Sequence, residues 1–245
     1  MRKFLLCICL PGLLLFSCKK DNNNNDGDGN PPPVIDNCRI LKSTRANFSD
    51  KTYEYDAQKR LIKSKTGNTV RTFAYNNDNT YTVSISEDNG QTISSIRTIT
   101  YNNDKMTTNV RIDYTGGHWE NTSFEYEGTR VVKRIYTHPI TSPSVTTYEW
   151  QNGNLIKEIS SSGNVTSTYA YDTNKLYQGT DYFGAGFFDY GIRTVVTKNR
   201  VNKAITSSAT YNITHYENQD GKVNGYKVDI EPGGDYTVNF TLACD

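Results

Sequence analysis

The stretch Tyr236-Thr237-Val238-Asn239-Phe240-Thr241-Leu242-Ala243-Cys244, near the C-terminus, decides the fold class. Apolar residues alternate in it with Thr and Asn, and Cys244 falls in phase with the apolar residues. Because successive side chains of a β-strand point to opposite faces, a period of two gives one apolar and one polar face. The segment therefore predicts a strand with one buried face and one solvated face.

The same alternation recurs throughout residues 38–245, for example in 81–86, 106–114 and 226–230. Short Asn-, Asp- and Gly-rich stretches such as 102–104 separate these runs, and those residue types tolerate the positive φ of tight hairpin turns. No stretch after residue 36 keeps helical spacing. Roughly ten to sixteen strands in sequence cannot remain one flat sheet. We expect an all-β fold, an antiparallel meander of hairpins that forms a large curved sheet or a partial or closed barrel, with aromatic side chains on its concave face.

A looser repeat of about one hairpin is superimposed on the alternation. It consists of pairs of large apolar residues, mostly aromatic, that we expect at strand ends: Tyr53/Tyr55, Phe73/Tyr75, Ile99/Tyr101, Phe124/Tyr126, Tyr148/Trp150 and Tyr169/Tyr171.

The first seventeen residues read as an export signal. Arg2 and Lys3 precede the apolar run Phe4–Phe16, which as a helix would span about 20 Å, less than the ~30 Å hydrocarbon core of a bilayer. The run ends Leu15-Phe16-Ser17-Cys18, which resembles the lipobox of bacterial lipoproteins. That resemblance implies cleavage before Cys18 and acylation of Cys18 with lipid chains such as palmitate, which anchor the protein in a membrane. The alternative is an ordinary secretory signal with an incidental cysteine.

Residues 18–36 form the expected lipidated tether. Their run DNNNNDGDGNPPP lacks apolar side chains and cannot join a core. The expected organisation is a signal peptide over 1–17, the tether over 18–36 and one all-β domain over 37–245. We expect an outer-membrane lipoprotein, on the periplasmic face or on the cell surface.

Cys38 and Cys244 are the two cysteines of the expected domain, at its opposite ends. An oxidising envelope permits a disulfide between them, which would join the first strand to the last. Two free buried thiols are the alternative.

Residues 53–61, Tyr-Glu-Tyr-Asp-Ala-Gln-Lys-Arg-Leu, resemble the YD repeat of Rhs and teneurin shells, with Gln58 or Lys59 where Gly is usual. As a whole, residues 38–245 resemble a domain-of-unknown-function family of Bacteroidetes lipoproteins with degenerate YD-like units. The resemblance implies an all-β fold and an envelope location, and it implies no activity.

Catalytic and metal-binding motifs are not recognisable in the sequence. His118, His138 and His215 lack metal-ligand spacing, and the carboxylates on strand-like runs are expected to pair with neighbouring cations, as in Arg111 with Asp113 and Lys227 with Asp229. The net charge of +1 gives no basic field for nucleic acid. We therefore expect no enzyme activity, no metal, no cofactor and no nucleic-acid partner.

The segment 181–191 concentrates aromatics among glycines and is the main candidate for ligand binding. Its aromatic platform would stack on sugar rings or on a partner protein, or the segment would instead plug one end of the sheet. Trp119 is a second candidate. The candidate ligand-binding residues are Tyr182, Phe183, Phe187, Phe188, Tyr190 and Trp119.

Together these features predict a lipid-anchored, non-enzymatic module that binds a glycan or another envelope protein. A structural or assembly factor of the envelope without a small ligand is the alternative, and a hydrolase of envelope polymers is a third possibility.

Overall fold

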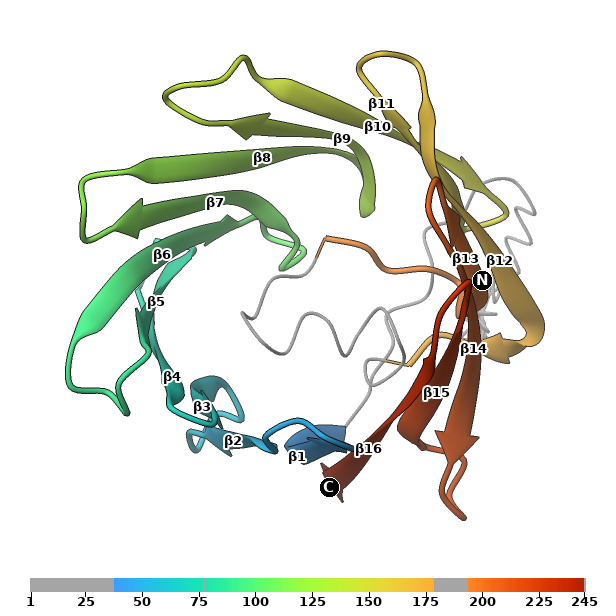
Figure 1. The fold of residues 1–245 in the computed structure, drawn as a ribbon, viewed down its shortest axis with the longest axis horizontal. Helices are drawn as coiled ribbons and strands as arrows, with labels where there is room; N and C mark the ends of the chain where they lie inside the picture. Colours follow the sequence, from blue (N-terminus) through green and yellow to red (C-terminus); the bar gives the residue numbers. More distant parts are fainter. Residues whose placement is uncertain (1–37, 77, 179–193, 245) are drawn as a thin grey trace, which may run out of the picture.

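Sixteen antiparallel strands form a closed barrel in the computed structural model, which describes residues 38–76, 78–178 and 194–244 (Figure 1). The expected all-β meander is confirmed, and of the curved forms considered it is the closed barrel. Within the described ranges no helix is long and apolar enough to cross a membrane. The first eight strands are β1 (Cys38–Arg45), β2 (Lys51–Tyr55), β3 (Leu61–Thr66), β4 (Thr69–Tyr75), β5 (Thr80–Ser86), β6 (Ile93–Tyr101), β7 (Thr107–Tyr114) and β8 (Trp119–Glu127). The second eight are β9 (Arg130–Thr137), β10 (Ser144–Gln151), β11 (Asn154–Ser160), β12 (Val165–Leu176), β13 (Asn199–Thr206), β14 (Thr210–Glu217), β15 (Val223–Glu231) and β16 (Asp235–Cys244).

Each strand pairs with its neighbours in sequence, and pairing of β1 with β16 closes the ring. The register runs from Cys38 opposite Cys244 to Arg45 opposite Val238, and a disulfide joins Cys38 to Cys244. The expected bridge between first and last strand is thus confirmed. We call the end of the barrel with these cysteines the cysteine end, and the opposite end, with Arg45, the far end.

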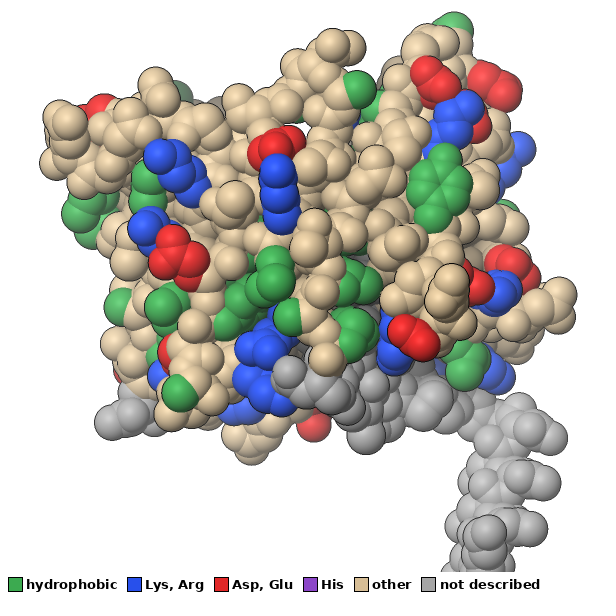
Figure 2. Space-filling model, turned by 90° about the horizontal axis from the view of Figure 1, so that it is seen from below, with side chains coloured by type: hydrophobic (Ala, Val, Ile, Leu, Met, Phe, Trp, Pro, Cys, Tyr) green, Lys and Arg blue, Asp and Glu red, His purple; other side chains and the backbone are tan. Residues whose placement is uncertain are grey.

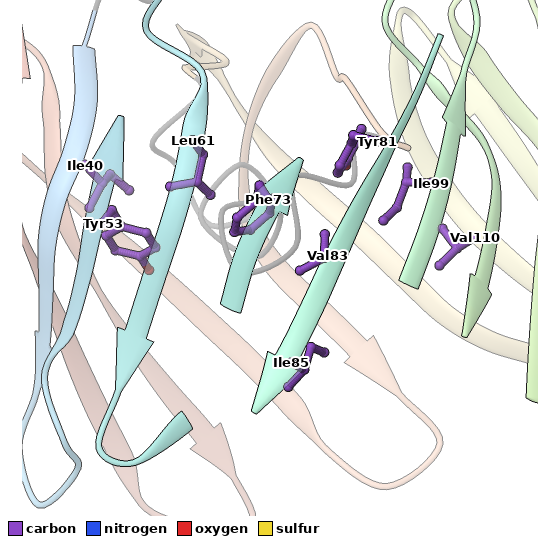
Figure 3. Close-up of a cluster of buried hydrophobic side chains, with 9 residues drawn as sticks. All are labelled: Ile40, Tyr53, Leu61, Phe73, Tyr81, Val83, Ile85, Ile99 and Val110. Carbon is purple, nitrogen blue, oxygen red and sulfur yellow. The ribbon is translucent and has the colours of Figure 1, made fainter. Parts of the chain in front are cut away.

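The inner face carries most of the large apolar side chains. Figure 3 shows one buried cluster on the inner side of β1–β7, made by Ile40, Tyr53, Leu61, Phe73, Tyr81, Val83, Ile85, Ile99 and Val110. Further clusters continue around the ring, with Val131 and Leu155 in one and Val201, Ile213 and Val228 in another. The expected placement of aromatics on the concave face is confirmed, because Tyr53, Phe73 and Tyr81 are buried there.

On the side of the barrel seen in Figure 2, acidic and basic side chains lie beside one another, with hydrophobic side chains between them. The ion pairs expected for Arg111 with Asp113 and Lys227 with Asp229 are present, at 2.9 and 2.7 Å. Comparable pairs are distributed around the barrel: Lys42–Asp50, Glu54–Lys63, Glu125–Lys133, Glu149–Lys157 and Lys227–Asp235.

The aromatic repeat has a structural role at the cysteine end. The second residue of a pair donates a hydrogen bond to a backbone carbonyl of the preceding strand in five of the six pairs: Tyr55 to Ile40, Tyr75 to Leu61, Tyr126 to Thr107, Trp150 to Val131 and Tyr171 to Leu155. In β2, β6, β8, β10 and β12 the register shifts directly before this residue, and the extra residue lies in the strand that follows, β3, β7, β9, β11 or β13. Bulges increase local twist and bend the strand, as closure of a sheet requires.

Burial keeps these hydroxyls protonated and so able to donate. Desolvation raises the pKa of Tyr75 to about 12, and it raises the pKa values of Tyr55 and Tyr126 well above their usual range.

The YD-like segment forms a five-residue turn that recurs at this end of the barrel. The Asp56 carboxylate accepts hydrogen bonds from the backbone N–H and the guanidinium of Arg60. Lys59 adopts a φ of 64°, and Lys105 and Gly221 adopt φ values of 60° and 71° at the same place in the turns after β6 and β14. Lysine and glycine therefore occupy the same place in these turns, the lysines at some cost in backbone strain.

The disulfide yields the first prediction. It closes a loop with a sequence separation of 206 residues, for which the chain-entropy estimate gives roughly 5 kcal/mol of stabilisation. We expect the Cys38→Ala/Cys244→Ala double variant to lose several kcal/mol in urea unfolding relative to the oxidised protein. A loss below about 1 kcal/mol would mean that the bridge does not limit the unfolded chain as that estimate assumes.

The aromatic repeat contains its own matched pair of variants. Tyr126→Phe removes the 2.6 Å hydrogen bond to the Thr107 carbonyl, so we expect a loss of about 1 kcal/mol in the free energy of unfolding. For Tyr101, among the described residues, there is no such bond, and Tyr101→Phe should change stability by less than about 0.5 kcal/mol. If Tyr126→Phe lowers the free energy of unfolding no more than Tyr101→Phe does, the hydrogen bond to Thr107 does not stabilise the barrel.

Candidate functional site

At the cysteine end, the described ends of the β12–β13 connection occupy part of the lumen (Figure 1). Tyr177 and Val196 pack against Met106, and Val195 packs against Val131 and Leu155. Asn154 and Asn199 bind each other through reciprocal hydrogen bonds of 3.0 and 2.9 Å and hold the start of β13 against β11. This end of the lumen therefore has a packed interior where the described residues meet.

Two cavities lie on the inner face toward the far end. The first, the seam cavity, has a volume of about 400 Å³ and lies where β1 meets β16. It is lined by Ser43, Thr44, Arg45, Phe48, Ser49, Lys51, Tyr53, Thr66, Tyr226, Tyr236, Val238 and Phe240. Ser43 lies opposite Lys51 in the register, and Arg45 lies opposite Val238, so both cations share the inner face with the aromatic residues.

The second cavity, of about 380 Å³, lies between β6 and β10. Its two cations are Arg97, opposite Val83 and Ile112, and Arg134, opposite Phe124. The remaining lining residues are Val110, Ile112, Thr122, Phe124, Tyr136 and Ser144. Arg134 donates a hydrogen bond of 3.0 Å to the Thr146 hydroxyl. Both cavities thus combine cationic groups and hydroxyls with an apolar wall, which suits a ligand with anionic or polyhydroxylated groups.

A polar cluster borders the second cavity. Tyr114 donates to the Glu120 carboxylate at 3.3 Å, and Glu120 lies 3.8 Å from Nε2 of His118. Desolvation, together with Glu120, raises the pKa values of Tyr114 and Tyr136. Glu120 lies on the inner face, since it is opposite Ile112 in the register. Its carboxylate accepts a hydrogen bond from Tyr114 and lies near His118.

His118 and His138, which lack metal-ligand spacing in the sequence, meet in this cluster with their Nε2 atoms 3.0 Å apart. The backbone N–H of Ile140 donates to Nδ1 of His138. Nδ1 is therefore an acceptor, and a neutral His138 carries its proton on Nε2 and donates it to His118. No group of three or more potential metal ligands occurs in the part of the chain that the structure describes. The histidine pair is thus a hydrogen-bonded unit.

Of the six predicted ligand-binding residues, the structure describes Trp119. Trp119 lies opposite Asp113 on the outer face, and the Arg111 guanidinium covers its ring at 4.9 Å. It is therefore separate from the lumen cavities. The aromatic residues Tyr182, Phe183, Phe187, Phe188 and Tyr190 lie outside the described residues, as does Cys18.

The inward cations Arg45, Lys51, Arg97 and Arg134 were not singled out from the sequence. Each interrupts or flanks an apolar run at an inward position of its strand, and this parity is the one signal that could have identified them.

A third cavity, of about 300 Å³, lies where β13 and β14 separate beyond the pair Lys203–Asn212. Glu217 binds both Lys175 and the buried Arg200 there, and these hydrogen bonds lower the pKa of the Glu217 carboxyl. His215 lines the same cavity and packs edge-on against Tyr226. Burial, and then the nearby Arg200, lower the pKa of His215 to about 4, against opposing effects of Glu217 and Asp172.

His215 predicts a pH dependence of stability. The pKa of His215 in the folded protein is about 4, below its ordinary value of 6.5. Between these pH values His215 therefore binds a proton in the unfolded chain but stays neutral in the folded protein. Stability should therefore fall as pH decreases through this window, by up to about 3 kcal/mol. In urea unfolding at several pH values, His215→Gln should flatten this slope. A slope unchanged by the substitution would assign the acid sensitivity to other groups.

No protein-family model matches the chain, and no curated protein matches it. Among solved structures it is similar to the crystal structure of a porin-like protein from Bacteroides uniformis, with 15% sequence identity and a TM-score of 0.59. The match covers 83% of this chain and 96% of that chain. At this identity the likeness concerns the fold, and it agrees with a large closed β-barrel.

Proposed function

We propose that this protein is a lipid-anchored, non-enzymatic module of the cell envelope that binds a glycan in the far-end cavities of its barrel. The observation that carries the proposal is the distribution of side chains between the two faces. Aromatic residues and cations line recessed cavities inside, whereas ion pairs are distributed around the outer wall. Recessed cavities of 300–1,000 Å³ suit small ligands better than they suit a flat protein partner.

The outer wall argues against a barrel that spans a bilayer. Transmembrane barrels carry an outward apolar band about 25 Å tall, and a cation facing lipid at its midplane costs about 2–4 kcal/mol. Here Lys63, Arg111, Lys133, Lys157 and Lys227 face outward in ion pairs around the ring. Membrane attachment through lipid on Cys18 fits such a wall, whereas insertion of the barrel does not.

The position of the tether supports the same arrangement. β1 begins at Cys38, so residues 18–36 join the barrel at its cysteine end. As the tether expected from the sequence, 19 residues would have a root-mean-square span of about 24 Å. The cavities at the far end then lie on the side of the barrel away from the anchor, where an envelope glycan can reach them.

The test uses the mature chain from residue 18 with Cys18→Ser, purified without detergent and applied to a glycan array. We expect a monodisperse protein that recognises a restricted set of glycans. Lys157→Ala, which alters the outer wall alone, should bind the same set. A protein that needs detergent, or an array without signal above background, would contradict the proposal. Shortening of a bound glycan during incubation would instead indicate a hydrolase.

A further inference from the structure

The seam cavity contains a cation with an unusual environment. The Arg45 guanidinium lies 4.1 Å from the ring centroid of Phe48 and 3.9 Å from that of Tyr236, between the two rings. Its Nε is buried, and among the described residues it has no hydrogen-bond partner. No described carboxylate lies within salt-bridge distance of Arg45, unlike Lys42 on the outer face of the same strand, which pairs with Asp50.

This arrangement leaves the planar charge oriented but without a counterion. Aromatic faces on both sides hold the guanidinium plane by cation–π attraction and stacking. Arg45 lines the cavity, so an anionic ligand there could accept from its terminal amino groups, and a carboxylate matches the fork of a guanidinium in geometry. The described lining residues of the cavity include the second cation Lys51 and no Asp or Glu, so the local charge favours an anion.

The rest of the wall suits a sugar ring. Tyr53, Tyr226 and Phe240 contribute rings, and Phe48 is 61% exposed, with one face on Arg45. The apolar C–H face of a pyranose packs on such rings. The hydroxyls of Ser43 and Tyr53, both lining residues, form a hydrogen bond of 3.5 Å with each other, and a hydroxyl can both donate and accept. A cavity of about 400 Å³ accommodates one or two sugar rings.

We propose that the seam cavity binds an acidic saccharide and that Arg45 anchors its carboxylate. This inference rests on the glycan-binding function proposed above and adds to it the site and the class of sugar. The cavity is formed where the first and last strands meet, so it exists only in the closed barrel.

The experiment is calorimetric titration of the mature lipidated chain in nanodiscs. The probes are a galacturonic-acid disaccharide and the neutral galactose disaccharide of the same linkage. We expect the acidic probe to bind at least tenfold more tightly, with an affinity that decreases as salt is added. Arg45→Gln should weaken its binding by at least tenfold and leave the neutral probe unaffected, and Arg45→Lys should retain part of the affinity.

Arg111→Gln is the matched control. Arg111 also covers an aromatic ring, that of Trp119, but it lies on the outer face and pairs with Asp113. The Arg111→Gln variant should bind both probes as the wild type does. An unfolding midpoint of Arg45→Gln close to that of the wild type would separate a lost contact from a lost fold.

Three results would overturn the inference. Equal affinity for the two probes, or unchanged binding by Arg45→Gln, would remove Arg45 as the anchor. Palmitate is titrated separately into the Cys18→Ser chain without lipid, and Arg45-dependent binding of palmitate in place of the saccharide would assign the cavity to a lipid carboxylate. If neither disaccharide binds while the glycan array has signals, this inference fails and the proposed function stands. An empty array contradicts the proposed function itself.

Discussion

Pairing of β1 with β16 is the constraint on which the rest of the structure depends. It joins the two ends of a chain of hairpins through a backbone ladder from Cys38–Cys244 to Arg45–Val238. An open sheet of this size would expose two edges to other chains and would have no interior. Closure removes both edges and turns the concave face into a lumen. It also places the first and last strands side by side, which creates the cavity between Arg45, Phe48 and Tyr236.

The closed ring also explains the unequal use of the two faces. Aromatic side chains line the inner face, and in five of the six pairs the second aromatic ties its strand to the preceding one by a hydrogen bond. The outer wall carries ion pairs and polar side chains together with exposed apolar residues such as Ile96, Val165 and Ile205. Likeness in fold to a porin-like protein does not by itself assign a function, because function depends on the sites that a fold presents.

Local patterns in the sequence predicted much of this fold. The alternation in 236–244, the turn residues and the aromatic pairs are properties of single strands and hairpins, and they report burial directly. The bridge between Cys38 and Cys244 could be proposed because two cysteines lay at the ends of the expected domain. The number of strands and full closure could not be derived in this way, since they depend on the summed twist and bulges of the whole sheet.

The candidate site was harder to predict, because its residues meet only through the closed topology. Arg45 and Tyr236 are almost two hundred positions apart in sequence, and neither has a distinctive motif around it. His118 and His138 meet because β8 and β9 pair with Asn121 opposite Thr137, a register that spacing alone does not reveal. The composition of segment 181–191, with aromatics among glycines, predicted a ligand-binding platform. The inward cations, in contrast, are single residues in strands of ordinary composition.

Hydrogen exchange of the backbone amides in detergent-free buffer tests the closed barrel most directly. The amides of β1 and β16 that take part in the ladder should exchange as slowly as those of β5 and β6 in the middle of the meander. Fast exchange along both terminal strands, with slow exchange confined to β5 and β6, would show an open sheet with two free edges and would contradict the account.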